Sequence, residues 1–83
     1  MTYKYKTKGT CSMWIDIEMT GDVIESVRFH GGCDGNLKGI ASMVKGMNAQ
    51  DVIGKLEGIR CGFKPTSCPD QLAKALKEIV NNQ

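Results

Sequence analysis

Residues 13–29 have the sequence Met-Trp-Ile-Asp-Ile-Glu-Met-Thr-Gly-Asp-Val-Ile-Glu-Ser-Val-Arg-Phe. On both sides of Thr20-Gly21-Asp22, most of the alternate residues are apolar, which is the spacing of a strand with one buried and one solvated face. Gly and Asp favour turns, so the stretch predicts an antiparallel hairpin. The alternating set is Met13, Ile15, Ile17 and Met19 on the first strand, and Val23, Glu25, Val27 and Phe29 on the second.

The residues before the hairpin carry a second alternation, Tyr-Lys-Tyr-Lys-Thr-Lys over residues 3–8. Alternating aromatic and basic side chains can bind a phosphate backbone. The same pattern is typical of an edge strand, in which the tyrosines face the core and the lysines protect the exposed side. We favour the edge strand, which adds a third strand from Tyr3 to Lys6.

After the hairpin, the spacing of the apolar residues changes from that of a strand to that of a helix. Leu37, Ile40, Ala41 and Val44 lie on one helical face, and Gly46 marks its end. Asn48 precedes a second, shorter helical segment that Gly58 ends, and Pro69 is typical of the first position of a last helix. These segments predict an α+β fold in one domain over residues 1–83, with an N-terminal antiparallel sheet of two to three strands followed by about three helices.

Length, charge and apolar content argue against a nucleic-acid-binding protein and against a membrane protein. The chain has 83 residues and a net charge of +2, with no basic run dense enough to predict a nucleic-acid surface. It has no apolar stretch long enough to cross a bilayer and no signal-peptide pattern, so we expect a cytoplasmic protein without a membrane partner. A domain this small buries only about 60% of its unfolded surface and commonly needs a disulfide, a metal or a partner for stability.

The four cysteines, Cys11, Cys33, Cys61 and Cys68, each fall at the end of a predicted element and off the buried stripes. Cys68 and Cys33 precede helices, where the helix dipole and unpaired N–H groups favour a thiolate. Four thiolates complete a tetrahedral zinc site, and the same ligands hold iron–sulfur clusters. The sequence therefore predicts one metal site made by all four thiols, with zinc ahead of a cluster.

The spacing leaves alternatives open. Gaps of 21, 27 and 6 residues separate the cysteines, and no CxxC pair is present, so the fold itself must bring them together. Buried, inert cysteines are one alternative, and one or two disulfides are another. Cytosolic thiols stay reduced, which favours metal or redox chemistry over disulfides.

Three other side chains are candidates for the surroundings of this site. His30 precedes Cys33 by three residues and could replace a cysteine as a ligand, orient a ligand or carry a proton. Asp34 and Asp70 each lie within two residues of a cysteine, although both are also typical capping residues of a helix start. The single histidine and the lack of a nucleophile–base or paired-carboxylate pattern leave no catalytic residue to name.

Residues 61–72 contain the string Thr66-Ser67-Cys68-Pro69-Asp70, which gives the TSCPD domain its name. With Cys11 after Lys8-Gly9-Thr10 and Cys33 in a glycine-rich turn, the whole chain resembles the small, stand-alone, four-cysteine members of that family. Related domains occur at the C-terminus of vitamin B12-dependent ribonucleotide reductases, so the resemblance implies a role in nucleotide or DNA biosynthesis. The chain is too short to be a complete reductase, and whether it is an enzyme stays open.

A weaker similarity is to iron–sulfur scaffold proteins of the NifU/IscU type. Those proteins have one cysteine before a hairpin strand, one at a helix start and one at the start of a late helix. Cys11, Cys33 and Cys68 match these three places in order. This similarity implies a NifU/IscU-like fold and a site where three loops meet. Cys61 is an additional thiol, which suits a held metal better than one that must be released.

Three functions follow. The first is a metal-binding module that serves a larger protein, such as a ribonucleotide reductase or a redox partner, with a nucleotide as a further candidate ligand. The second is a thiol-redox protein in which Cys61 and Cys68 exchange electrons. The third is a scaffold for sulfur or iron–sulfur clusters. A nucleic-acid partner is not expected.

Overall fold

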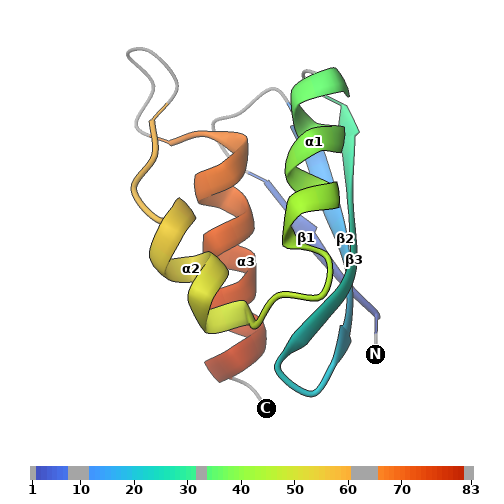
Figure 1. The fold of residues 1–83 in the computed structure, drawn as a ribbon. Helices are drawn as coiled ribbons and strands as arrows, with labels where there is room; N and C mark the ends of the chain where they lie inside the picture. Colours follow the sequence, from blue (N-terminus) through green and yellow to red (C-terminus); the bar gives the residue numbers. More distant parts are fainter. Residues whose placement is uncertain (1, 8–11, 32–33, 61–65, 82–83) are drawn as a thin grey trace.

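A computed structural model of the protein describes residues 2–7, 12–31, 34–60 and 66–81. Three strands come first: β1 (Thr2–Lys6), β2 (Ser12–Thr20) and β3 (Val23–Gly31). Three helices follow: α1 (Asp34–Val44), α2 (Ala49–Leu56) and α3 (Cys68–Asn81). This order confirms the predicted α+β fold with its N-terminal sheet (Figure 1).

The strands form one antiparallel sheet in the order β1-β2-β3. Ile15 pairs with Phe29 and Ile17 with Val27, so the predicted alternation of both strands meets on one face. The prediction is wrong at the start of β3, where Ile24 is fully buried and Val23 is 43% exposed. A register shift opposite Glu18 and Met19 explains this, because a bulge adds one residue and exchanges the faces of the side chains beyond it.

The predicted edge strand is confirmed in β1, which pairs with β2 alone. Tyr3 and Tyr5 are half-buried and pack against the core, while Lys4 and Lys6 are exposed. Burial raises the pKa of the Tyr5 hydroxyl, and the negative charge of Glu78 on α3 raises it further. The lysines on the other side keep the unpaired edge from joining another sheet.

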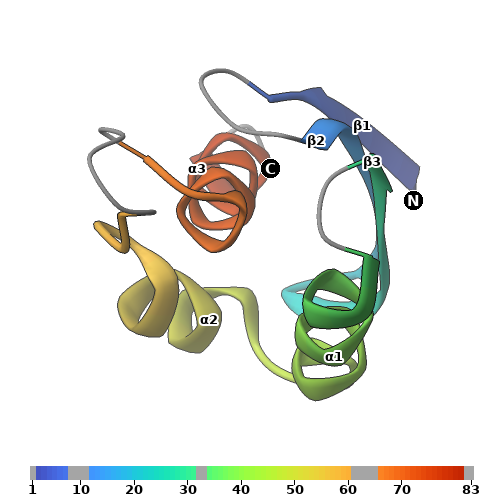
Figure 2. The same cartoon turned by 90° about the horizontal axis from the view of Figure 1, so that it is seen from above.

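Two helices cover the inner face of the sheet. Seen along the molecule, α3 lies over β1 and β2, α1 packs on β3, and α2 packs on α3 away from the sheet (Figure 2). The side of the sheet opposite the helices carries Lys4, Trp14, Asp16 and His30. The fully or nearly fully buried apolar residues join both layers: Ile15, Ile17, Met19, Ile24, Val27, Val44, Ala49, Val52, Ile53, Leu72, Ala75, Leu76 and Ile79.

The segment between α1 and α2 is tied to the start of β3. Gly46 has a φ of +84° and ends the turn after α1, a conformation that glycine adopts without strain. Its N–H donates to the carbonyl of Ile24 at 2.7 Å, and the N–H of Ile24 donates to the carbonyl of Met47 at 2.9 Å. Asn48 then caps α2 by accepting from the N–H of Gln50. These bonds cover part of the outer edge of β3.

Among the described residues, no helix combines the length and the apolar character that crossing a membrane requires.

Candidate functional site

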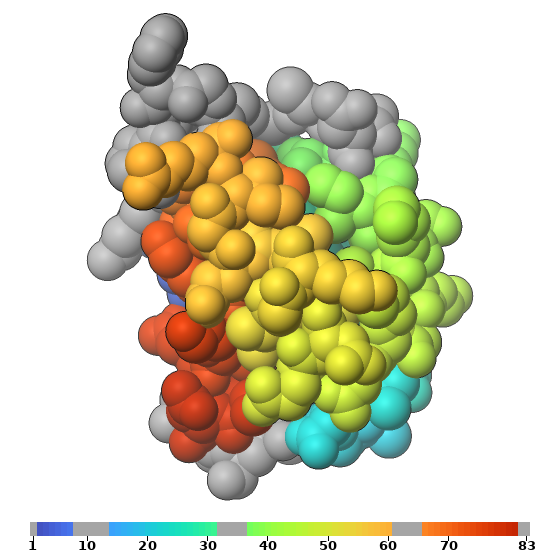
Figure 3. All heavy atoms as spheres, turned by 60° about the vertical axis from the view of Figure 1, so that its left-hand side comes forward, coloured from blue at the N-terminus to red at the C-terminus, as the bar shows by residue number. Residues whose placement is uncertain are grey.

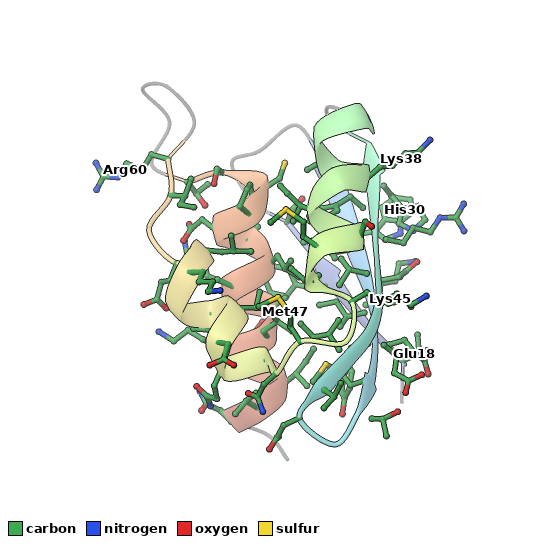
Figure 4. The ribbon with its side chains drawn as sticks, viewed as in Figure 1. Glu18, His30, Lys38, Lys45, Met47 and Arg60 are labelled. Carbon is green, nitrogen blue, oxygen red and sulfur yellow. The ribbon has the colours of Figure 1, made fainter. Side chains whose placement is uncertain are left out.

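The start of α3 lies at one end of the molecule, and several other element ends lie there with it. The start of β2, the end of β3 and the start of α1 are all at this end, which is the upper one in Figure 1. Arg60 points outward from the same half of the molecule (Figure 4). Of the four cysteines, Cys68 belongs to the described residues, and Cys11, Cys33 and Cys61 lie outside them.

Cys68 is the first residue of α3 and is only 7% exposed. The carbonyl of Ser67 accepts the first helical bond, from the N–H of Gln71 at 2.8 Å, and the Ser67 hydroxyl accepts from the N–H of Asp70 at 3.2 Å. Ser67 is therefore the N-cap, and the helix begins one residue earlier than Pro69, where the sequence predicted it. The thiol sits inside the first turn, among buried side chains, rather than at an exposed loop end.

Two hydrogen bonds fasten the chain that follows α2 to this helix start. The Ser67 hydroxyl donates to the carbonyl of Ile59 at 2.6 Å, and the N–H of Gly58 donates to Oδ1 of Asp70 at 2.7 Å. Gly58 has a φ of +88°, the left-handed conformation that commonly ends a helix. In the space-filling view, residues 57–60 lie against α3 as one continuous surface (Figure 3). The chain that leads to Cys61 therefore starts from a fixed position beside Cys68.

Asp70 is the centre of this network, and its side chain is almost fully buried. Besides Gly58, its carboxylate accepts from the Thr66 hydroxyl and pairs with Nζ of Lys74 at 3.2 Å. The amide of Gln71 donates to the Thr66 hydroxyl at 3.0 Å. Burial favours the neutral acid, but the bonds from Thr66, Gly58 and Lys74 outweigh it and hold the pKa of Asp70 below 3.8. Asp70 is thus an anion at neutral pH whose oxygens bind the protein itself.

The other two residues predicted around the site belong to β3 and to the start of α1. Nε2 of His30 is 2.6 Å from Oδ2 of Asp16, and the imidazole stacks on Trp14 with ring centroids 4.7 Å apart. Nζ of Lys4 lies over the same indole, 4.7 Å from its centroid. His30 therefore faces the side of the sheet away from the helices. Asp34 is the first residue of α1, and its side chain is not among those described.

Comparison with known proteins adds one decisive match. A family model for the TSCPD domain matches residues 1–80 of the 83. The chain belongs to the TSCPD domain family. No curated protein and no solved structure matches it, so the weaker similarity to NifU/IscU scaffolds has no support from these comparisons.

Within this TSCPD domain, four of the five residues of the family's string divide into two kinds. Thr66, Ser67 and Asp70 bind one another and the chain after α2, so they are structural. The hydrogen bonds of these three residues hold Cys68 at the helix start, but they do not involve its thiol. Thr66, Ser67 and Gln71 were not among the predicted site residues, although Ser67-x-x-Asp70 is the pattern of a capping box. The carboxylate of Asp70 accepts from Gly58 and Thr66 instead of closing that box.

A four-thiol metal site in the TSCPD domain stays a prediction. Over residues 2–7, 12–31, 34–60 and 66–81, no three His, Cys, Asp or Glu side chains come together as a metal site would require. Because three of the predicted ligands lie outside these ranges, the structure describes only the Cys68 part of the predicted set.

The N-cap provides a direct test of the structural role of Ser67. Replacement of Ser67 by alanine removes the acceptor for the Asp70 N–H and the donor to Ile59, so we expect a loss of about 1.5 kcal/mol in the free energy of unfolding. Urea unfolding of the purified protein measures it. Ser42→Ala, at an exposed position of α1, is the matched control and should change stability by less than about 0.5 kcal/mol. Equal effects of the two changes would contradict the capping role.

Proposed function

We propose that this TSCPD domain is a small metal-binding module in which Cys11, Cys33, Cys61 and Cys68 hold one zinc ion. The observation that carries the proposal is the shared position of the chain segments next to these residues. Ser12 begins β2, Gly31 ends β3 and Asp34 begins α1, all at the end of the molecule where α3 starts. Cys11 and Cys33 are therefore attached to element ends that already face the same region as Cys68.

The network around Asp70 supports the fourth ligand. Gly58 and Ile59 are bonded to Asp70 and Ser67, so the chain leaves α2 beside the start of α3 and reaches Cys61 two residues after Ile59. Six residues separate Cys61 from Cys68 in the sequence, and the described residues on either side of residues 61–65, Ile59 and Ser67, are hydrogen-bonded to each other. A pair of thiols from this part of the chain, with one from each of two other segments, gives four ligands, the number that structural zinc sites use.

The burial of Cys68 favours a held metal over thiol exchange. A redox-active cysteine must be reached by the thiolate of its partner, so reactive cysteines are at least partly exposed. The side chain of Cys68 is in the first turn of α3 and only 7% exposed, which suits a ligand that stays in place. The iron–sulfur cluster remains the alternative cargo for the same four thiols, since cluster ligation also uses Cys₄ sets.

The zinc would act as a cross-link. It would join the start of β2, the connection between β3 and α1, the chain after α2 and the start of α3. The larger protein that the module serves is proposed from the family alone, as a ribonucleotide reductase or another enzyme of nucleotide metabolism. On this proposal the domain contributes a stable folded surface for docking, and it carries out no reaction by itself.

A series of single cysteine-to-serine changes tests the proposal. If one site uses all four thiols, Cys11→Ser, Cys33→Ser, Cys61→Ser and Cys68→Ser should each lose most of the bound zinc, while Ser42→Ala keeps it. Zinc per chain, measured by elemental analysis after purification without added metal, gives the result. A different outcome, in which only Cys61→Ser and Cys68→Ser lose reaction with thioredoxin and no variant loses metal, would establish the redox alternative.

A further inference from the structure

Four side chains form a cluster on the side of the sheet opposite the helices. A hydrogen bond of 2.6 Å joins Nε2 of His30 to Oδ2 of Asp16, and the imidazole stacks on the indole of Trp14. Nζ of Lys4 lies over the same indole. These contacts connect β1, β2 and β3 beside the position of His30 in Figure 4. We refer to Lys4, Trp14, Asp16 and His30 as the outer-face cluster.

The backbone pairing of β2 with β3 is irregular beside this cluster. Trp14 is opposite His30, and the next pair toward the start of β2 and the end of β3 is Ser12 with Gly31. β2 therefore has one additional residue between these two pairs, and such a bulge interrupts the regular ladder of hydrogen bonds. Side chains that face each other across two strands stabilise the pairing by their own contacts. The outer-face cluster thus joins β2 to β3 where the backbone ladder is interrupted.

Two of the proposed zinc ligands follow directly from these strand ends. Cys11 immediately precedes Ser12 in the sequence, and Cys33 follows Gly31 by two residues. Because Ser12 and Gly31 pair with each other, the connections to both cysteines leave the sheet from neighbouring strands at the same end. A metal site is precise only when its ligands are supported by side chains that do not themselves touch the metal. The relative position of these two strand ends therefore determines where both connections begin.

We propose that His30 is a positioning residue of the zinc site. Its contacts with Asp16 and Trp14 hold the end of β3 against β2, and thereby fix the two connections that carry ligands. The side chains of His30 and Asp16 are 28% and 36% exposed and lie outside the buried core. Pairs this exposed contribute little to overall stability, so the effect of these contacts is local to the strand ends. The role depends on the proposed zinc site.

Zinc affinity, measured by competition with a chelating dye, and the visible spectrum of the cobalt-substituted protein test this role. His30→Ala should weaken zinc binding at least about tenfold, the lower end of the effect of residues that support metal ligands. It should also alter the cobalt bands, because they report the geometry of the ligands. His30→Gln keeps a side-chain N–H that can donate to Asp16, so its zinc affinity should be within about threefold of the unaltered protein. Circular dichroism checks that both variants fold.

Thr20→Ala is the matched control. The Thr20 hydroxyl donates to Oε1 of Glu25 at 2.7 Å, a bond that joins the same two strands at their opposite end. Its loss should change zinc affinity by less than about twofold, since the site is distant and shares no partner with the outer-face cluster.

The outcomes separate this role from the zinc site itself. An unaltered protein that binds no zinc would contradict the proposed function, and this role with it. If the unaltered protein binds zinc, two results would overturn the positioning role alone: a His30→Ala variant that binds zinc no more weakly than Thr20→Ala, or a His30→Gln variant as weak as His30→Ala.

Discussion

Removal of the proposed zinc from the purified domain is expected to lower its free energy of unfolding by about 5 kcal/mol or more, because binding of a structural zinc contributes directly to folding. The core of this domain is small: among the described residues, its main cluster has thirteen buried members. Domains of this size have little stability to spare without an additional cross-link. The proposed zinc would join four chain segments at the end of the molecule where α3 starts. Thermal unfolding followed by circular dichroism, with and without a zinc chelator, measures the loss.

The cysteine variants provide the control for this experiment. Cys61→Ser without bound zinc should unfold at the same temperature in the presence and absence of the chelator, since it has no metal to lose. Identical unfolding curves of the unaltered protein with and without chelator would show that its fold does not depend on a metal.

Replacement of Asp70 by alanine is expected to cost about 3 kcal/mol, the second-largest effect. The change removes a buried acceptor of hydrogen bonds from Gly58 and Thr66, and bonds to a charged group contribute about 1.5–3 kcal/mol each. It also frees the chain after α2 from the start of α3. Urea unfolding of the zinc-loaded protein measures the loss. Asp51→Ala, an exposed acidic residue in the first turn of α2, is the control and should cost less than about 1 kcal/mol.

The pH dependence of the Asp70 contribution has a definite sign. The pKa of Asp70 is lower in the folded protein than the 3.8 of an ordinary aspartate, so ionisation of this group stabilises the fold above pH 3.8. The difference in stability between the unaltered protein and Asp70→Asn should therefore hold from pH 7 down to that region, and shrink as the pH falls below it. A difference that already disappears between pH 7 and 6 would show that another group is responsible.

The sequence predicted the fold well where side chains repeat with a regular period. The alternation on β2 and the tyrosines of β1 identified the buried face, because a strand with one solvated side must alternate. The helical stripes predicted three helices in the observed order. The start of β3 was missed because a bulge changes the face of a side chain, and nothing in Val23 or Ile24 alone indicates which of them is buried.

The candidate site could be predicted only in part. Cys68 and Asp70 were identified as residues near a helix start, and the structure places both there. Gly58 and Asp70 are twelve residues apart in the chain, and the hydrogen bond between them depends on how α2 and α3 pack. Local patterns do not contain such contacts. The alternation that puts Phe29 on the buried face also puts His30 on the opposite face. Its contacts with Asp16 and Trp14 depend on the register of β2 and β3, which the sequence does not give.

The most direct test of the four-thiol site is elemental analysis of the anaerobically purified chain, combined with a count of titratable thiols before and after denaturation. The account predicts about one zinc per chain, with all four thiols protected in the folded protein and four released when it is denatured in the presence of a chelator. A brown protein that contains iron would show that the same four cysteines hold an iron–sulfur cluster and not zinc. Four thiols that react freely in a folded, metal-free chain would contradict the account.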